Sequence, residues 1–228
     1  KKLKIFCFLP LIFASISSII QGSRTSVILS AVVLFSAFLS YRIIIYNGKL
    51  KVSILRSLLN FFFVSVIFLF FFIFIQWLRQ GLDPIIFDLL TIKLKAYLFG
   101  YLSAFTNWFV DSEIAYSSES FFSTFAGPLN LLGLIERPLG FYGAAEISTN
   151  ITTNIFTAWR SIVSDFSVVG SLIISFWFGS FMQFEYQKQK KHEFDGFLIL
   201  SIFYAFTLYS PLISIFHYNS IIFSWLIV

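Results

Sequence analysis

Long apolar runs, separated by short polar segments, account for most of the sequence. A helix needs about 20 mostly apolar residues to cross the hydrocarbon core of a bilayer. Five runs meet or approach this length and predict membrane-spanning helices: Ile5–Ile20, Thr25–Tyr46, Ser57–Leu78, Phe166–Phe184 and Gly196–Phe216. A sixth begins near Ser220 and is cut off by the end of the sequence. Because the chain also starts without a methionine, at Lys1, we expect it to be a portion of a longer protein.

The composition agrees with this pattern and excludes most soluble classes. Of the 228 residues, 58% are hydrophobic and 12% are charged, whereas a typical soluble domain is about 45–50% apolar and about 25% charged. Disordered chains, collagen, coiled coils and water-soluble enzymes are therefore excluded. We predict an all-α, polytopic helical membrane protein with five full spans and one partial span. The single cysteine, Cys7, excludes a disulfide framework or a zinc cluster built from this chain alone.

The basic residues indicate how the chain is oriented in the membrane. The net charge is +5, and the bases gather in clusters beside apolar runs instead of forming a stripe, so no nucleic-acid partner is expected. Counting spans puts all of these clusters on one side, which the positive-inside rule assigns to the cytoplasm. Their members are Lys1, Lys2 and Lys4; Arg42, Lys49, Lys51 and Arg56; and Lys188, Lys190 and Lys191.

A long segment between the third and fourth spans, residues 79–165, falls on the opposite side. It holds eight of the 11 acidic residues and is rich in Phe, Leu, Tyr and Trp, a composition that argues against disorder. Prolines and glycines divide it into short pieces, which we expect to form helices lying on or dipping into the outer membrane face. The chain is thus divided into three spans (1–78), a large structured loop (79–165) and C-terminal spans (166–228).

The most informative polar pattern runs along residues 154–170. Asn154, Thr157, Ser161 and Asp165 recur at intervals that put them on one narrow face of a helix. Lipid cannot satisfy such a polar face inside a membrane. Two interpretations remain open. One is an amphipathic interfacial helix in which Asp165 caps a helix that begins at Phe166, and the other is a helix that lines an outward-facing polar cavity.

Several bases lie on the outer side, where the positive-inside rule disfavours them. Arg24 is at the outer end of a span, and Arg137 and Arg160 belong to the large loop. A guanidinium can bind phosphate through two parallel hydrogen bonds, or it can simply reach lipid headgroups. His217, near the outer end of the fifth span, fits an interfacial polar residue better than an acid or base.

An aromatic cluster at helical spacing occurs early in the large loop: Tyr97, Tyr101, Phe105, Trp108 and Phe109. It is typical of an aromatic belt at the membrane interface, and sugar stacking is the functional alternative. The sequence contains no P-loop, His-rich metal motif, nucleophile elbow or dinucleotide-binding fingerprint.

Three short motifs resemble those of one family of membrane enzymes. Asn154-Ile155-Phe156-Thr157-Ala158, followed by Asp165-Phe166 and Gly170, is similar to a stretch of the Wzy-type O-antigen polymerases, which join oligosaccharide repeat units. Gly22-Ser23-Arg24-Thr25 resembles the family's Gly-Ser-Arg, and Tyr101 to Phe105 resembles a stretch early in its large periplasmic loop. The resemblance covers about Gln21 to Phe216. It departs at Ser167, where the family has glycine, and in length, since family members have additional spans before these.

The resemblance implies a glycosyltransferase of the bacterial inner membrane whose large loop is periplasmic. It would transfer a growing glycan from undecaprenyl pyrophosphate to the terminal sugar of a new lipid-linked repeat unit, with no metal or cofactor. The partners implied are undecaprenyl-pyrophosphate-linked oligosaccharides, membrane lipids and a chain-length regulator protein.

The chemistry of this transfer assigns expected roles. Negative charge that develops on the pyrophosphate needs fixed cations, for which Arg24 and Arg160 come first and Arg137 second. The acceptor hydroxyl needs a base, with Asp165 preferred and Glu146 in reserve. Hydrogen bonds that orient sugar or phosphate are expected from Asn154 and Thr157.

Other functions are compatible with the same residues. The nearest is an O-antigen ligase-like glycosyltransferase, which uses the lipid A core as acceptor. A polysaccharide transporter or flippase would carry ionisable residues near the midplane of its spans, whereas here they cluster at span ends and in the outer loop. A structural membrane subunit would use the polar stripe for helix packing.

Overall fold

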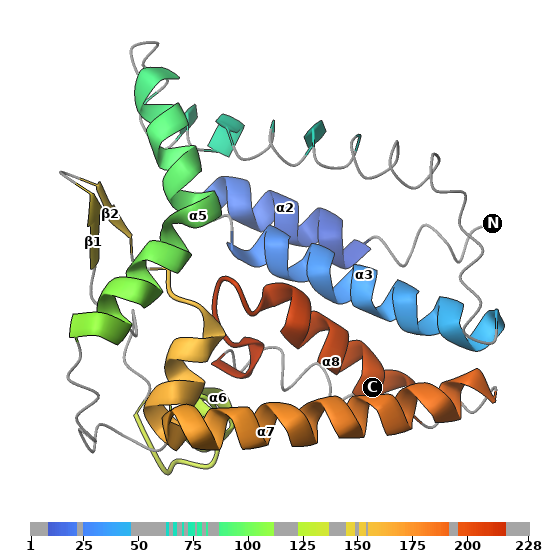
Figure 1. Ribbon diagram of the computed structural model, residues 1–228. Helices are drawn as coiled ribbons and strands as arrows, with labels where there is room; N and C mark the ends of the chain where they lie inside the picture. The colour runs from blue at the N-terminus through green and yellow to red at the C-terminus, as the bar shows by residue number, and fades with distance from the viewer. Residues whose placement is uncertain are drawn as a thin grey trace. The chain divides into compact units, whose positions relative to one another are not determined.

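A computed structural model (Figure 1) describes residues 9–21, 25–46, 87–111, 123–136, 145–148, 151–153, 155–191 and 196–217, together with separate positions between 63 and 81. This part of the chain is mostly helical, which confirms the predominance of helix that the apolar runs predict. It also contains one two-stranded sheet, which the all-α prediction missed. The chain divides into two compact units: residues 1–92 with 188–197, and residues 93–187 with 198–228.

The first unit contains two apolar helices that pack against each other, α2 (Leu9–Gln21) and α3 (Thr25–Ile45). Helix α3 matches the predicted second span to within one residue, and its 21 residues have no polar face. The hydroxyl of Ser36 is satisfied within the helix, because its Oγ donates to the Val32 carbonyl oxygen at 2.7 Å, whereas the buried Ser40 Oγ has no hydrogen-bond partner in the described part of the structure. A helix of this kind needs lipid or protein on every side.

The described positions of the predicted third span, between 63 and 78, are helical. Ile75 is fully buried, whereas five other apolar residues that recur with a helical period are exposed: Phe63, Val66, Ile67, Phe70 and Phe74. Such a stripe is one apolar face of a helix, as expected of a segment that contacts lipid or protein. The start of the first predicted span and the partial sixth span lie outside the described residues.

The predicted outer loop contains longer regular structure than its prolines and glycines suggested. Helix α5 (Phe87–Asp111) runs for 25 residues, so the prediction of short pieces is wrong there. Strands β1 (Ala145–Ser148) and β2 (Ile151–Thr153) form an antiparallel hairpin. The hairpin packs on α5 where Gly100 leaves room: a Cβ there would be 2.9 Å from Ile147 Cδ1.

Helix α7 (Ala158–Lys190) is 33 residues long and is broken at Ser167, whose backbone angles are φ 63° and ψ 173°. It begins eight residues before the predicted boundary at Phe166, because the polar stripe is helical as well. The backbone N–H of Gly170 donates to Ser167 Oγ at 3.4 Å. Ser167 therefore caps the second half of α7. Of the two interpretations left open for the polar stripe, the one in which Asp165 caps a helix that begins at Phe166 does not hold, because α7 begins at Ala158.

Helix α8 (Phe197–Tyr209) is shorter than the predicted fifth span. It ends at Tyr209 because a residue that precedes proline, here Ser210 before Pro211, disfavours the helical conformation. The chain then turns into the 3-10 helix η2 (Ile215–His217), which packs against the short helix α6 (Ala126–Leu131).

Helices α7 and α8 lie side by side (Figure 1) and meet through aromatic rings. The Phe178 ring is 4.0 Å from that of Phe203 and 5.2 Å from that of Phe206, and the Phe206 ring stacks on Phe216 of η2 at 5.5 Å. The Phe216 ring is in turn 5.6 Å from Phe125, which precedes α6. Edge-to-face and offset contacts of this kind stabilise aromatic cores.

Two described helices are long and apolar enough to cross a membrane: Val27–Ile45 within α3, and α7. Helix α8 is apolar but has only 13 residues. These helices support association with a membrane, and the total of five spans stays a prediction.

Candidate functional site

Buried polar side chains gather where the start of α7 meets the turns before α6 and after α8. We call this group the polar junction. Its members are Ser123, Thr124, Thr157, Ser161, Asp165, Ser214 and His217, and each is less than a tenth exposed. Three of them follow from the helical stripe, because Thr157, Ser161 and Asp165 recur every fourth residue along one face.

Asp165 is the charged centre of the polar junction. Its Oδ1 accepts hydrogen bonds from the hydroxyl of Ser123 at 2.6 Å and from the Ser123 backbone N–H at 3.3 Å. Its Oδ2 accepts the Thr124 backbone N–H at 2.7 Å. With 6% of its surface exposed, this carboxylate fastens the turn before α6 to α7 through charge-assisted hydrogen bonds.

The turn after α8 is fastened to the same place. The Ser214 hydroxyl donates to the Thr124 carbonyl oxygen at 3.4 Å, and the backbone N–H of Ala158, the first residue of α7, donates to the Ser210 carbonyl oxygen at 2.8 Å. The backbone N–H of His217 donates to the Ser214 carbonyl oxygen at 3.1 Å. Segments from residues 123, 158 and 214 are therefore held at one point.

Two hydroxyls of the polar junction lack hydrogen bonds in the described part of the structure. They are Thr124 Oγ1 and Thr157 Oγ1, and their residues are 4% and 5% exposed. A buried hydroxyl without a partner costs about 1–3 kcal/mol by mutational measures. Such groups call for a specific explanation, and a polar ligand or an ordered water would satisfy them.

Arg160 lies in the first turn of α7, three residues after Thr157, and two aromatic rings contact its guanidinium. Its Cζ is 3.9 Å from the Phe156 ring centroid and 5.3 Å from that of Trp108 on α5. We call these three residues the Arg160 bracket. Contact with ring faces restricts the plane of the guanidinium, whose N–H groups point outward along its edge.

Glu146 lies on β1 near the same part of α5. Its backbone carbonyl oxygen accepts a hydrogen bond from the Asn107 side-chain amide at 3.3 Å, and the residue is exposed. Asn107 directly precedes Trp108 of the Arg160 bracket. Two consecutive residues of α5 therefore contact the β-hairpin and the start of α7: Asn107 bonds to Glu146, and Trp108 contacts Arg160.

Four of the site residues predicted from the sequence lie in the described part of the structure. Asp165 and Thr157 belong to the polar junction, Arg160 to its bracket and Glu146 to the hairpin. The other three, Arg24, Arg137 and Asn154, lie outside the described residues. His217, predicted to be interfacial, is buried at 7% exposure.

Sequence reasoning missed Ser123, Thr124 and Ser214. Isolated serines and threonines carry no periodic signal, and only the folded chain brings them to Asp165. The aromatic cluster on α5 is confirmed in part, because the rings of Phe105, Trp108 and Phe109 lie 5.7–6.5 Å apart. Among the described residues no three His, Cys, Asp or Glu side chains form a group that could hold a metal ion.

Comparison with known proteins leaves the family open. No protein-family model, no curated protein and no solved structure matches the chain.

Proposed function

We propose that the chain belongs to an integral membrane glycosyltransferase that polymerises undecaprenyl-pyrophosphate-linked oligosaccharide repeat units at the periplasmic face of the bacterial inner membrane. The Arg160 bracket supports this proposal most. It combines a cation of fixed plane with two aromatic faces, at the end of an apolar helix long enough to cross a bilayer. A lipid pyrophosphate that carries a glycan needs both features.

In the proposed reaction the acceptor sugar hydroxyl attacks the anomeric carbon of the donor glycan. The bond between that carbon and the pyrophosphate oxygen breaks, and the leaving lipid pyrophosphate carries the electron pair. The edge of the Arg160 guanidinium would stabilise this charge, which grows in the transition state. Arg24 and Arg137 remain further candidates for the same role.

A carboxylate must take the proton of the acceptor hydroxyl. We assign this role to Glu146, because its side chain is exposed, whereas Asp165 is buried and accepts three hydrogen bonds from Ser123 and Thr124. Asp165 is then a positioning residue that holds the polar junction together. Thr157, with Asn154 close by in the sequence, would donate hydrogen bonds to sugar or phosphate, which would satisfy the Thr157 hydroxyl.

The test is complementation of a strain that lacks the intact protein, with the surface polysaccharide ladder as readout. Arg160→Ala should abolish long chains while the protein level stays normal, and Arg160→Lys should restore little, because an ammonium lacks the planar fork. Arg42→Ala is the matched control. The Arg42 guanidinium also lies over two rings, Phe38 at 5.5 Å and Tyr46 at 5.1 Å, but on the predicted cytoplasmic side.

A normal ladder from Arg160→Ala at normal protein level would remove the bracket from the mechanism. The same strain separates polymerase from ligase. Loss of a polymerase leaves single repeat units attached to the lipid A core, whereas loss of a ligase leaves the core without any repeat unit.

A further inference from the structure

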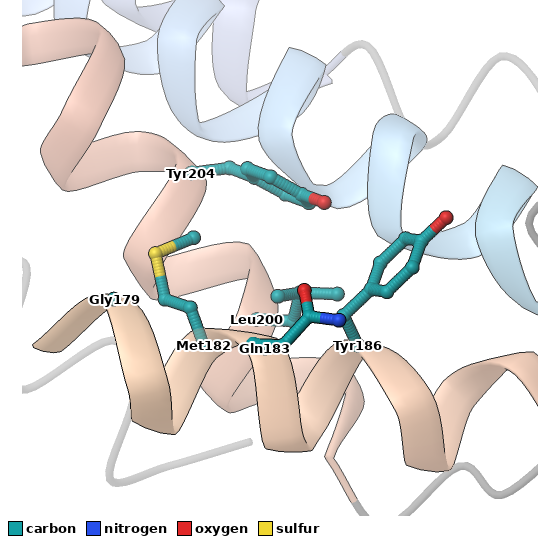
Figure 2. A pocket seen from close by; sticks show the side chains of 6 residues that line it. All are labelled: Gly179, Met182, Gln183, Tyr186, Leu200 and Tyr204. Atoms are coloured by element: carbon teal, nitrogen blue, oxygen red, sulfur yellow. The ribbon is translucent and has the colours of Figure 1, made fainter.

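A pocket of 280 Å³ lies between α7 and α8, far along α7 from the Arg160 bracket. Its lining is shown in Figure 2 and comprises Gly179, Met182, Gln183 and Tyr186 of α7 with Leu200 and Tyr204 of α8. The spacing of the α7 residues puts them on one helix face. Small-molecule sites are usually about 300–1,000 Å³, so this pocket has room for only a part of a lipid-sized molecule.

The pocket is open beside residue 179, which has no side chain. A Cβ built on Gly179 would meet no other atom within 4 Å. The space above this glycine is therefore open, and neither Met182 nor Leu200 fills it. Glycine also weakens a helix by about 1 kcal/mol relative to alanine, so nothing in the packing of α7 itself requires it here.

The polarity of the lining changes along the pocket (Figure 2). Gly179 and the Met182 thioether lie at one end, and the Gln183 amide and the two tyrosine hydroxyls lie toward the other. Gly179 and Tyr186 are seven residues apart, about 10 Å along a helix. The apolar end is nearer the middle of α7, and the polar end is nearer its C-terminus, which matches the order of tail and headgroup in a lipid at a membrane interface.

The surroundings indicate which lipid would bind. On α7, Phe176, Trp177 and Phe181 are exposed apolar side chains beside the pocket, as expected of a helix surface covered by lipid tails. Three lysines follow Tyr186 within five positions of the sequence, at 188, 190 and 191. Chain length alone keeps them within about 18 Å of Tyr186. Clusters of this kind attract anionic headgroups in the cytoplasmic leaflet.

We propose that the pocket between α7 and α8 binds one anionic phospholipid molecule of the inner leaflet. An acyl chain lies over Gly179 against Met182 and Leu200, and the ester and headgroup oxygens bond to Gln183, Tyr186 and Tyr204. The site lies at the opposite end of α7 from the proposed transfer reaction and does not depend on that reaction. The bound lipid fixes the spacing of α7 and α8.

Native mass spectrometry of the intact protein tests this proposal, with phosphatidylglycerol and phosphatidylcholine added in turn to the detergent solution. The wild type should retain one phosphatidylglycerol in preference to phosphatidylcholine. Gly179→Leu places a side chain in the open space, where its Cβ meets no other atom within 4 Å, and should weaken retention by at least about tenfold. Ser180→Leu is the matched control, because the same side chain one position along points about 100° away, and it should bind as the wild type does.

Any of three results would overturn the proposal. Gly179→Leu and the wild type could retain phosphatidylglycerol equally, or the wild type could retain the two phospholipids equally. The third is displacement of phosphatidylglycerol by an equal amount of undecaprenyl-pyrophosphate-linked oligosaccharide. In Tyr204→Phe and Gln183→Leu the apolar end of the pocket is kept. We expect these two variants to lose the preference between the lipids and to keep the fold. The measurement requires no glycosyl transfer, so it stands or falls apart from the proposed function.

Discussion

Replacing Ser167 by glycine should stabilise the protein, although glycine normally weakens a helix. Ser167 breaks α7 with φ 63° and ψ 173°, a backbone conformation that only glycine adopts readily. A side chain at this position therefore carries strain. The hydrogen bond from the Gly170 N–H to Ser167 Oγ compensates for a part of it.

The magnitude follows from three opposing effects. Glycine relieves about 1–3 kcal/mol of backbone strain. It gives back about 0.4–1 kcal/mol because the unfolded chain gains conformational entropy, and the loss of a serine cap to glycine costs a few tenths of a kcal/mol more. The expected net effect is a gain of about 1 kcal/mol in the free energy of unfolding.

The measurement is reversible unfolding in mixed micelles as the fraction of denaturing detergent rises. Ser175→Gly is the control, because Ser175 lies within the regular part of α7 and its hydroxyl donates to the Ser171 carbonyl oxygen at 2.6 Å. Glycine there should destabilise the protein by about 0.5 kcal/mol. If Ser167→Gly destabilises the protein as Ser175→Gly does, the break in α7 is not a strained conformation and the reasoning fails.

Three further substitutions test the packing around the site. Asp165→Asn should lower the free energy of unfolding by about 1–3 kcal/mol, because the amide group cannot accept all three hydrogen bonds of the carboxylate. Faster proteolysis at residues 123–125 would report the loss, whereas unchanged cleavage would refute the anchoring role. Thr157→Val should raise the unfolding free energy by about 1 kcal/mol, since it removes a buried hydroxyl without a partner, and it should also lower polymer formation. A variant that is more stable and fully active would show that the hydroxyl binds no substrate. Gly100→Leu should detach the hairpin from α5 and cost about 1–3 kcal/mol by overpacking. Gly100→Ala should be close to neutral in the same unfolding assay, because its Cβ is tight only against the flexible tip of Ile147 at 2.9 Å and makes ordinary contacts at 3.8 Å with Ala96 and Thr153.

Much of the helical structure could be predicted because burial in lipid demands long apolar runs. Helix α3 and the polar face of α7 follow directly from hydropathy and from the recurrence of Thr157, Ser161 and Asp165. The early end of α8 also had a signal, since Pro211 disfavours helix at the residue before it. The hydrophobic run continues past this proline, and the predicted span followed the run to Phe216 instead of ending at the proline.

The contacts of the site could not be predicted in the same way. Asp165 bonds to Ser123 and Thr124, which lie 42 and 41 positions away in the sequence, and no periodic pattern joins residues that distant. Ser167 caps the second half of α7 because the helix is broken there and begins again after the break. The strain at Ser167 is equally invisible in a list of side-chain preferences, because serine gives no signal of a positive φ angle.

The most direct test of the proposed function is glycan elongation by the purified intact protein in lipid vesicles that contain undecaprenyl-pyrophosphate-linked repeat units. The wild type should produce longer lipid-linked glycans and release one undecaprenyl pyrophosphate for each linkage formed, and Glu146→Gln and Arg160→Ala should each stop both processes without unfolding the protein. Elongation by Arg160→Ala at the rate of the wild type, or an active wild-type preparation that moves repeat units across the bilayer without joining them, would contradict the account.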